Sequence, residues 1–461
     1  MANRNLKVII LAAGKGTRMK SELPKVLFQV AGKPMVDYVI DTAESLDPEE
    51  IVVIIGSGAE LLRNHLKNRN VSFVVQAEQL GTGHAVMQAE ECFSDFDGKI
   101  LILCGDMPLV KKDTIEKFIA KSTDQKVSFI SVKVKDPKGY GRVLRSANGS
   151  LISIKEEKDA SETEKKLDEI NTGIYLVDAK ILKERLKDIS NENAQKEYYL
   201  TDIVKKGAEI YLADDETEFI GINDRKALSE ASKNIYKEIN NSLMLNGVTI
   251  IDPSFTYIGG DVKIAKDVTI YPNTYISGKT VIGSDTIIYP GCRIIDSIIE
   301  EDCEIKDNSL IENSFVGARS SVGPMAHLRP ESRLMGENKI GNFVETKKIT
   351  FGIGSKASHL TYLGDAEIGS NVNVGCGTIT CNYDGISKHK TVIGDDVFVG
   401  SDVQFVAPIK IGNGALIAAG STITKDVPED SLAITRADQK NIEGFVKKWK
   451  EKKLKSKNGE K

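Results

Sequence analysis

A glycine-rich segment, Ala12-Ala-Gly-Lys-Gly-Thr-Arg-Met19, follows directly after the first apolar run of the chain. Glycines let backbone N–H groups approach phosphate oxygens, and Lys15 and Arg18 add positive charge. Lys25 comes six residues after this segment, where it is placed to reach the same phosphates. The segment is neither a Walker A loop nor a dinucleotide fingerprint, because the GK[ST] ending and the later glycine are absent. Its residue types nevertheless predict a phosphate-binding site.

A carboxylate and a run of amides come later in the same half of the chain. Gly105-Asp106 ends the apolar run Ile100–Leu103, and an exposed carboxylate at a strand end is suited to hold Mg²⁺. An aspartate there also commonly caps a turn, so Asp106 alone leaves both interpretations open. The segment Gln76–Ala85 offers side-chain amides and backbone groups that match the flat edge of a nucleobase.

The second half of the chain has a different candidate, His359, which is one of only five histidines. Lys347, Lys348 and Lys356 precede it closely. Imidazole takes a proton readily near neutral pH, so His359 is a candidate general base beside an anionic substrate. The alternatives are a hydrogen-bonded packing role for the histidine and solvated lysines at the surface.

The residues around His359 follow a hydrophobic period of six, which matches neither an α-helix nor a two-sided strand. A chain that turns a corner every six residues stacks into a parallel β-solenoid, and glycines suit such corners. We expect this solenoid over residues 251–435, with about ten coils of three hexads each. The positions predicted to point inward are Ile264, Ile270, Ile276, Ile282, Ile288, Ile294, Leu310, Val316, Val322, Leu328, Leu334, Ile340, Ile393, Val399, Phe405, Ile411, Ile417 and Ile423.

The six-residue period fails in two intervals, between Ile340 and Ile368 and between Val374 and Ile393. Loops that leave a rigid scaffold are where binding groups concentrate. His359 lies in the first interval, and the second holds a polar stretch after Cys376. We therefore expect loops with binding residues in both intervals.

The N-terminal half alternates short apolar runs with amphipathic stretches, which predicts an α/β domain with a parallel, doubly wound sheet. The expected strands are Leu6–Leu11, Ile51–Ile55, Val71–Val75 and Ile100–Leu103, and the expected helices are Met35–Glu44, Ala59–Lys67, Gly83–Glu91 and Thr114–Lys121. Helical spacing of Leu228, Ala231, Ile235, Ile239 and Leu243 then predicts a connecting helix with one buried stripe. The expected division is an α/β domain over 1–225, a linker helix over 226–250, and the solenoid with a basic tail over 251–461.

The composition sets outer bounds on function. With 461 residues, a net charge of −4 and a pI near 5.9, the chain lacks the basic bias of nucleic-acid-binding proteins. Its six cysteines are scattered without a CxxC pair, which is typical of reduced thiols in a cytosolic protein. No apolar run approaches the ~20 residues that span a bilayer, so we expect a cytoplasmic protein without an integral membrane segment. The lysine-rich end around Trp449 reads as a solvated tail or short amphipathic helix, with an anionic-surface contact as the alternative.

The first half resembles the sugar-1-phosphate nucleotidyltransferases. The motifs that carry the resemblance are Leu11–Met19, Pro24-Lys25, Gly105-Asp106, Gly139-Tyr-Gly-Arg142, Glu156-Glu-Lys-Asp159 and Glu169-Ile-Asn-Thr-Gly173. The resemblance implies a Rossmann-like mixed sheet and uridylyl transfer from UTP to N-acetylglucosamine-1-phosphate. It implies Arg18 and Lys25 as catalytic residues and Asp106 and Asn223 as Mg²⁺ ligands. The residues implied to bind UTP or the UDP-sugar are Leu11, Gly14, Lys15, Gly16, Lys25, Gln76, Gly81, Thr82, Gly141, Glu156, Asn171, Thr172 and Asn223.

The second half resembles the hexapeptide-repeat acyltransferases, which use coenzyme A, through Leu328-Arg-Pro330, Gly341–Glu345, Lys356–Asp365 and Thr380–Gly385. Over residues 4–445, the chain resembles the bacterial bifunctional N-acetylglucosamine-1-phosphate uridylyltransferase and glucosamine-1-phosphate N-acetyltransferase family, which supplies UDP-N-acetylglucosamine for peptidoglycan and other cell-wall polymers. This resemblance implies a left-handed parallel β-helix with His359 as general base. The implied ligands of glucosamine-1-phosphate are Arg329, Lys347, Tyr362 and Asn373, and those of acetyl-CoA are Cys376, Asn382, Tyr383, Ser401, Ala419 and Arg436.

The two reactions require different catalytic groups. A sugar phosphate is already an anionic nucleophile, so attack on UTP requires positioning, Mg²⁺ and lysine charge rather than a base. The amine of glucosamine-1-phosphate is largely protonated near neutral pH, so a base must remove a proton before it attacks the thioester. The family commonly has alanine at Cys376, which implies contact with the thioester oxygen through the backbone amide. The alternative for Cys376 is an acyl-carrying thiol.

Assembly and two competing functions complete the expectations. Flat solenoid faces packed side by side create clefts between copies, so we expect a homotrimer with shared acetyl-transfer sites. One alternative is a single-activity nucleotidyltransferase with a regulatory or oligomeric solenoid, against which His359 and its lysines argue. The other is a non-enzymatic exchange-factor subunit of translation initiation, which would not need the intact Gly14–Arg18 segment or Asp106.

Overall fold

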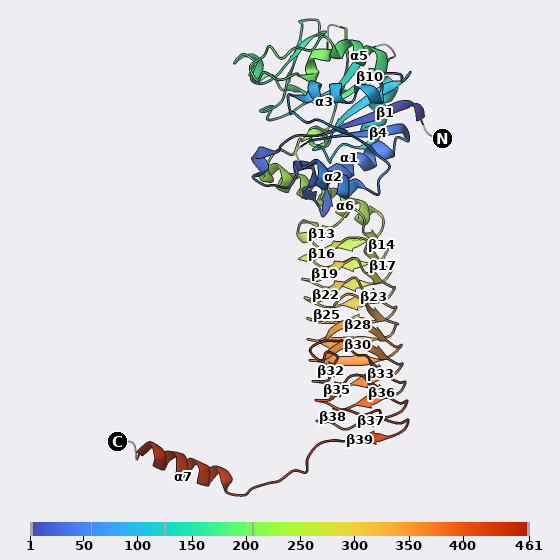
Figure 1. The fold of residues 1–461 in the computed structure, drawn as a ribbon, viewed down its shortest axis with the longest axis vertical. Coiled ribbons are helices and arrows are strands. Elements are labelled where there is room, and N and C mark those ends of the chain that lie inside the picture. The colour runs from blue at the N-terminus through green and yellow to red at the C-terminus, as the bar shows by residue number, and fades with distance from the viewer. Residues whose placement is uncertain (1–2, 57, 124–125, 205–206, 459–461) are drawn as a thin grey trace. The chain divides into compact units, whose positions relative to one another are not determined.

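The computed structural model describes residues 3–56, 58–123, 126–204 and 207–458. The chain forms two compact units, one of Met1–Ser242 with Ile258–Gly260, the other of Leu243–Tyr257 with Asp261–Lys461. The first unit is a helix-covered sheet and the second is a stack of short parallel strands (Figure 1).

The first unit contains a mixed sheet of nine strands among its described residues, in the order β11-β7-β10-β6-β1-β4-β5, with β8 paired to β10 and β9 paired to β8. The strands of this unit are β1 (Asn3–Ala12), β2 (Gln29–Val30), β3 (Lys33–Pro34), β4 (Pro48–Ile55), β5 (Ser72–Val75), β6 (Lys99–Cys104), β7 (Val127–Lys133), β8 (Arg142–Arg145), β9 (Leu151–Lys155), β10 (Glu169–Asp178) and β11 (Glu209–Ala213). β1 runs parallel to β4 and β6, as the alternation predicts. A wholly parallel sheet is wrong, because β10 runs antiparallel to both β6 and β7.

Helices cover both faces of this sheet. They are α1 (Met35–Glu44), α2 (Ala59–Leu66), α3 (Thr82–Gln88), α4 (Lys112–Lys121) and α5 (Ala179–Leu186). Val8 and Ile10 of β1 pack in one core with α1, α2 and α4, whereas Ile9 packs in another with α3 and α5. Both cores are apolar because successive side chains of a strand point to opposite faces, and this strand is buried on both.

The expected connecting helix is α6 (Arg225–Leu245). Two residues of its predicted stripe, Ala231 and Ile235, are buried and pack with Met19 at the end of the phosphate-binding segment. The Arg225 guanidinium also donates to the Met19 carbonyl at 3.2 Å. α6 therefore buttresses the segment that the sequence predicts to bind phosphate.

The second unit is a parallel solenoid in which each coil pairs with the next. Within the described residues, one sheet has eleven strands: β12 (Thr249–Ile250), β15 (Thr269–Ile270), β18 (Ile287–Ile288), β21 (Glu304–Ile305), β24 (Ser321–Val322), β27 (Lys339–Asn342), β29 (Lys356–His359), β31 (Asn373–Val374), β34 (Phe398–Val399), β37 (Leu416–Ile417) and β39 (Leu432–Ala433). The other has seventeen: β13 (Thr256–Ile258), β14 (Lys263–Ile264), β16 (Thr274–Ser277), β17 (Val281–Ile282), β19 (Arg293–Ile295), β20 (Ile298–Ile299), β22 (Leu310–Glu312), β23 (Phe315–Val316), β25 (His327–Leu328), β26 (Ser332–Leu334), β28 (Glu345–Phe351), β30 (Tyr362–Ile368), β32 (Ile379–Cys381), β33 (Thr391–Ile393), β35 (Gln404–Val406), β36 (Ile409–Ile411) and β38 (Thr422–Ile423). A helix, α7 (Phe445–Asn458), forms from the lysine-rich end.

The predicted inward positions are buried except Ile264 and Leu310, which are half-buried. Ile276 pairs with Ile294, eighteen residues later, but Ile294 pairs with Ile311, only seventeen residues later. Counting back in sixes from Val316 selects Leu310, but the fully buried residue is Ile311, which precedes Val316 by only five residues. Two sides shorten to five residues, from Ile294 to Ile299 and from Ile311 to Val316. Each contains a residue with a left-handed backbone, Asp296 with φ 47° and Asn313 with φ 46°. Aspartate tolerates this conformation better than most residues.

The two interruptions of the period have different structures. Between Ile340 and Ile368 the chain stays paired with the preceding coil through β29 and β30, so the expected loop there is wrong. Phe351 follows the buried Thr346 after five residues, which is again a shortened side. The second interruption is a loop, as expected. The next inward residue after Thr380 is Ile393, thirteen residues on instead of six, and the additional chain forms a hairpin outside the solenoid.

None of the helices in the described ranges combines the length and the apolar character that crossing a membrane requires.

Candidate functional site

A cleft of about 300 Å³ lies where β1 and β6 end. Of the predicted nucleotide-site residues, its lining includes Leu11, Gly14, Lys25, Gln76, Gly81, Thr82 and Asp106. Lys15 and Arg18 are exposed and lie outside this lining. Gln79 of the predicted Gln76–Ala85 segment also lines the cleft, as do Cys104 and Glu197, which the sequence analysis did not select. The cleft thus unites segments that are far apart in the chain at the carboxyl ends of parallel strands, where such folds bind ligands.

One ammonium group joins the predicted metal ligands. Lys25 Nζ forms an ion pair with Asp106 Oδ2 and donates to Asn223 Oδ1 at 3.1 Å. The Ile222 amide donates to the Asp106 carbonyl at 3.0 Å, which ties the Asn223 loop to the end of β6. Two oxygen donors that converge on a cation fit Mg²⁺, which prefers carboxylate, amide and phosphate oxygens. No group of three or more His, Cys, Asp or Glu residues in the described parts of the chain is placed to hold a metal.

Gly14 and Gly16 of the predicted phosphate-binding segment suit their positions for different structural reasons. Gly16 has φ 59°, and a Cβ there would lie 2.7 Å from Lys25 Cβ, so a side chain would displace the lysine. A Cβ on Gly14 would meet nothing within 4 Å, so the space beside it belongs to the cleft. Backbone N–H groups at such an open position are accessible to phosphate oxygens.

The proposed base-reading residues are held rigidly. Gln76 is 3% exposed, and its Nε2 lies 3.0 Å from the Gly81 carbonyl and 3.1 Å from His84 Nδ1. Thr82 Oγ1 accepts from the Leu200 amide at 3.1 Å. The amide and hydroxyl groups at this end of the cleft are therefore oriented before any ligand binds.

None of the residues predicted to hold the amino sugar lines this cleft, and three of them, Gly141, Glu156 and Asn171, form a second cluster. The Asn171 amide donates to the Gly141 carbonyl at 2.8 Å, and a Cβ on Gly141 would lie 3.4 Å from Glu156 Oε1. Thr201 donates to the same Glu156 oxygen at 3.3 Å. Burial raises the pKa of Glu156, and the charges of nearby carboxylates raise it further. Thr172 instead donates to the Ile130 carbonyl inside the sheet at 2.8 Å.

Tyr140 is a contact that sequence reasoning missed, although it lies inside the Gly139–Arg142 motif. Its hydroxyl accepts from the Gly221 amide at 3.1 Å, which holds the loop that carries Asn223. Burial raises the pKa of Tyr140, so this hydroxyl stays neutral at physiological pH.

In the second unit, four predicted residues occupy one corner in consecutive coils: His359, Cys376, Ser401 and Ala419. Backbone hydrogen bonds trace this corner from Gly377 N to Leu360 O (3.0 Å), Asp402 N to Cys376 O (2.7 Å) and Gly420 N to Ser401 O (2.8 Å). Arg436 continues it, because its Nη1 donates to the Ala419 carbonyl at 2.8 Å. Residues spread over most of the last hundred positions thus form one stripe with an imidazole at its end.

A cluster of cations lies beyond this corner. Arg329 and Lys347 stand in adjacent coils, where the Arg329 amide donates to the Thr346 carbonyl at 2.9 Å. Repulsion by Lys388 and then by Arg329 lowers the pKa of Lys347, and an ion pair with Glu345 at 2.7 Å raises the pKa of Arg329. Lysines crowded in this way favour a bound anion. Lys388 was missed as a site residue, although the broken period marks its hairpin.

Two further predicted residues frame this cluster. Tyr362 is in register with Glu345, directly beside the cations. Asn373 lies on β31 in the other sheet, in register with Lys356 and Phe398, so the structure does not bring it into the same strand ladder.

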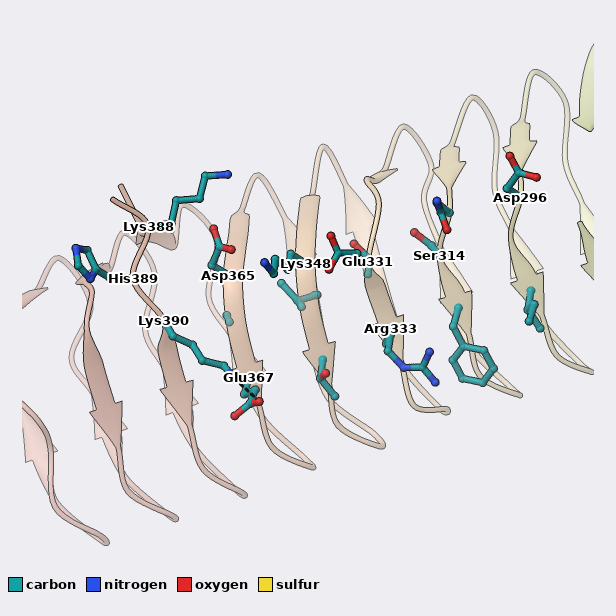
Figure 2. A pocket seen from close by; sticks show the side chains of 17 residues that line it. Asp296, Ser314, Glu331, Arg333, Lys348, Asp365, Glu367, Lys388, His389 and Lys390 are labelled. Carbon is teal, nitrogen blue, oxygen red and sulfur yellow. Dashed lines mark ion pairs between the residues drawn. The ribbon is translucent and has the colours of Figure 1, made fainter. Parts of the chain in front are cut away.

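A groove of about 900 Å³ runs along the seventeen-stranded sheet next to the cation cluster (Figure 2). Lys348 and Asp365, which line it, directly follow Lys347 and Gly364 in the chain, and Lys388 and His389 of the hairpin lie toward one end. The groove carries both signs of charge and contains none of the predicted ligands.

Comparisons with known proteins give matches to both halves of the chain. A family model described as nucleotidyl transferase matches residues 7–224, and one described as the GMPPB C-terminal domain matches residues 258–410. The chain is similar to curated proteins named "Bifunctional protein GlmU". That of Geotalea uraniireducens (strain Rf4) is 50% identical, over 97% of this chain and 99% of the relative. Those of Geotalea daltonii and Staphylococcus epidermidis are 51% and 52% identical, over 96% and 95% of this chain and 99% of each relative. The predicted fold class, an α/β nucleotidyltransferase domain followed by a left-handed parallel β-helix, is confirmed.

Proposed function

This chain belongs to the bifunctional GlmU family, and we propose that its two units catalyse successive steps in the synthesis of UDP-N-acetylglucosamine. The solenoid transfers an acetyl group from acetyl-CoA to glucosamine-1-phosphate. The α/β unit then transfers a uridylyl group from UTP to N-acetylglucosamine-1-phosphate and releases diphosphate. The product supplies peptidoglycan and other cell-wall polymers.

In uridylyl transfer, the sugar phosphate attacks the α-phosphorus of UTP, and the bond to the diphosphate leaving group breaks. Lys25 lies in the cleft and Arg18 on the segment beside it, so both supply positive charge to the phosphates. Gly14, Lys15 and Gly16 present backbone groups and charge to the triphosphate. Gln76, Gly81 and Thr82 read the uracil, whereas Gly141, Glu156 and Asn171 hold the sugar. These side chains act by positioning, since no base is required.

Mg²⁺ is the cofactor that this site fits. Asp106 and Asn223 would hold it, because their oxygens already converge on the Lys25 ammonium. Bound Mg²⁺ neutralises phosphate charge in such reactions. Lys25 would then be free to contact the triphosphate itself.

In acetyl transfer, His359 accepts a proton from the substrate amine, which attacks the thioester carbonyl. The new C–N bond forms as the C–S bond breaks, and coenzyme A leaves as a thiol. Among the hydrogen bonds of the described residues, none engages the Cys376 N–H, which is thus available to the oxyanion. Arg329, Lys347, Tyr362 and Asn373 bind the sugar phosphate. The acetyl-CoA ligands are Cys376, Asn382, Tyr383, Ser401, Ala419 and Arg436.

We assign uridylyl transfer to residues 1–225, a linker helix to 226–250 and acetyl transfer to 251–461. A homotrimer with parallel solenoids would place the exposed His359 corner in a cleft between copies. The partners are otherwise small-molecule substrates, with no nucleic acid, and the compartment is the cytoplasm.

This proposal rests on two separate groups of residues. Asp106 and Asn223 converge on the Lys25 ammonium in one unit, and His359 lies at a corner of the solenoid in the other. The test is one assay mixture with all substrates, followed for free thiol and diphosphate while one substrate at a time is omitted. Thiol release should require glucosamine-1-phosphate and acetyl-CoA, and diphosphate release should require UTP and the acetylated sugar. Diphosphate without thiol would indicate a single-activity nucleotidyltransferase, and neither product would indicate a non-enzymatic scaffold.

A further inference from the structure

The hairpin Asn382–Lys390 leaves the solenoid at the second break in its period. It carries two of the proposed acetyl-CoA ligands, Asn382 and Tyr383, and it brings Lys388 to Lys347 in the cation cluster. The position of this one hairpin therefore affects both substrates of acetyl transfer.

The base of the hairpin is tied to β30 on both sides. Asn382 Nδ2 donates to Asp365 Oδ2 at 2.5 Å, and Lys390 forms an ion pair with Glu367. Asn382 is also buried, at 8% exposure. These contacts hold the two ends of the hairpin but not the residues between them.

The tip has no apolar packing to hold it, because Ile386 is 92% exposed and Tyr383 is 60% exposed. Its order depends on polar contacts, and most of them meet at Asp384. Asp384 Oδ1 accepts from the amides of Ile386 at 2.8 Å and Ser387 at 2.7 Å. Asp384 Oδ2 lies 2.7 Å from His389 Nε2, which connects the two arms of the hairpin.

Backbone contacts also connect the two arms of the hairpin. Tyr383 and Lys388 form an antiparallel bridge, and the His389 amide donates to the Asn382 carbonyl at 2.8 Å. The Ser387 amide, then His389 and the Ile386 amide, hold the pKa of Asp384 well below its usual range, so this carboxylate stays charged at physiological pH. Lys388 directly precedes His389, so a contact that holds the histidine also limits where the lysine reaches.

We propose that Asp384 and His389 are positioning residues for acetyl transfer, which act together as a clasp that holds Lys388 and Tyr383 at the substrate site. The proposal rests on the acetyltransferase function proposed above. Neither residue touches the reacting atoms. The clasp lowers the conformational freedom of the hairpin before substrates bind, which reduces the entropy cost of binding.

The test compares His389→Leu, which removes the ring donor, with His389→Gln, which retains an N–H near the same place. In acetyl transfer, His389→Leu should raise the KM for glucosamine-1-phosphate about 2- to 5-fold, the scale of one lost polar contact at the surface, while kcat changes less. His389→Gln should restore most of the loss. Combining Asp384→Asn with His389→Leu should be little worse than the poorer single variant, because both remove the same contact.

Two controls separate the clasp from general instability. The full-length variants should keep uridylyl transfer unchanged. His65→Leu removes a comparable histidine–aspartate contact, His65 Nε2 to Asp37 Oδ2 at 2.9 Å, and should leave the acetyl-transfer KM unchanged.

An unchanged KM in His389→Leu, equal impairment of the leucine and glutamine variants, or loss of both activities would overturn the clasp. If the parent protein releases no coenzyme A from the complete mixture, the proposed acetyltransferase function itself has failed, which is a different result.

Discussion

His359 and Cys376 occupy the same corner of the solenoid in consecutive coils, seventeen residues apart. Ala357 pairs with Val374, and the Gly377 amide donates to the Leu360 carbonyl at 3.0 Å. The Cys376 backbone therefore lies next to the proposed general base, and its thiol need take no part in catalysis. This relationship makes the role of Cys376 testable.

Cys376→Ala should retain acetyl transfer within about 3-fold, because the N–H that would contact the oxyanion remains. The measurement is thiol release at saturating glucosamine-1-phosphate and acetyl-CoA. A loss of 100-fold or more, on the scale of a removed nucleophile, would favour the acyl-carrying thiol instead.

His359→Asn should lower acetyl transfer by about 10²–10⁴-fold, the contribution of a placed general base, and leave uridylyl transfer intact. Asparagine keeps a polar side chain at this exposed position, so the coil should fold normally. The two activities are measured on one preparation, and equal loss of both would contradict separate sites.

Asp106→Ala should produce the reverse pattern, with diphosphate release lost and thiol release retained, because it removes one of the oxygens that converge on the Lys25 ammonium. Chelation of divalent metal in the parent should have the same selective effect. Metal-independent uridylyl transfer would refute the Mg²⁺ assignment.

Glu156→Gln should stabilise the protein at high pH while it weakens sugar binding in uridylyl transfer. Burial raises the folded-state pKa of Glu156, so its stabilising contribution is complete below the unfolded pKa and is lost as pH rises through the folded pKa. Glutamine avoids the cost of a buried charge. The gain in Tm over the parent should therefore be larger at pH 8 than at pH 4. A gain that grows toward acid would show the opposite sign of shift.

Ile311→Ala should cost about 2–5 kcal/mol of unfolding free energy, as expected for a fully buried isoleucine, whereas Leu310→Ala should cost about 1 kcal/mol or less. Denaturant unfolding of the two variants gives a matched comparison, because adjacent residues on one strand are truncated in the same way. Equal costs would contradict the five-residue side from Ile311 to Val316.

Of the glycine and lysine motifs, Gly14 and Lys25 line the cleft where β1 and β6 end, and sequence could indicate them because glycine and lysine are residue types that suit phosphate binding. Gln76, Gly81 and Asp106 were also predicted, and the cleft includes all three. Glu197 and Cys104 escaped prediction, since nothing near them in the chain marks them as ligands. Tyr140 escaped in another way, because its partner Gly221 lies eighty-one residues away.

The solenoid shows what a periodic sequence pattern by itself does not predict. A six-residue count selects Leu310 rather than Ile311, because an αL corner can shorten a coil by one residue without changing the residue types around it. The same shortening between Ile340 and Ile368 imitates the signature of a loop.

The order of residues along the chain determined the two architectures, because hydrophobic period and glycine placement are properties of neighbouring positions. Tertiary structure alone decided which distant groups meet, such as Asp106 and Asn223 at the Lys25 ammonium or Lys347 with Lys388. Those meetings depend on coil lengths and strand register, which accumulate over many residues. One residue added to or removed from a coil changes the sequence number of every later inward position. A local sequence pattern does not record the total number of residues in the preceding coils.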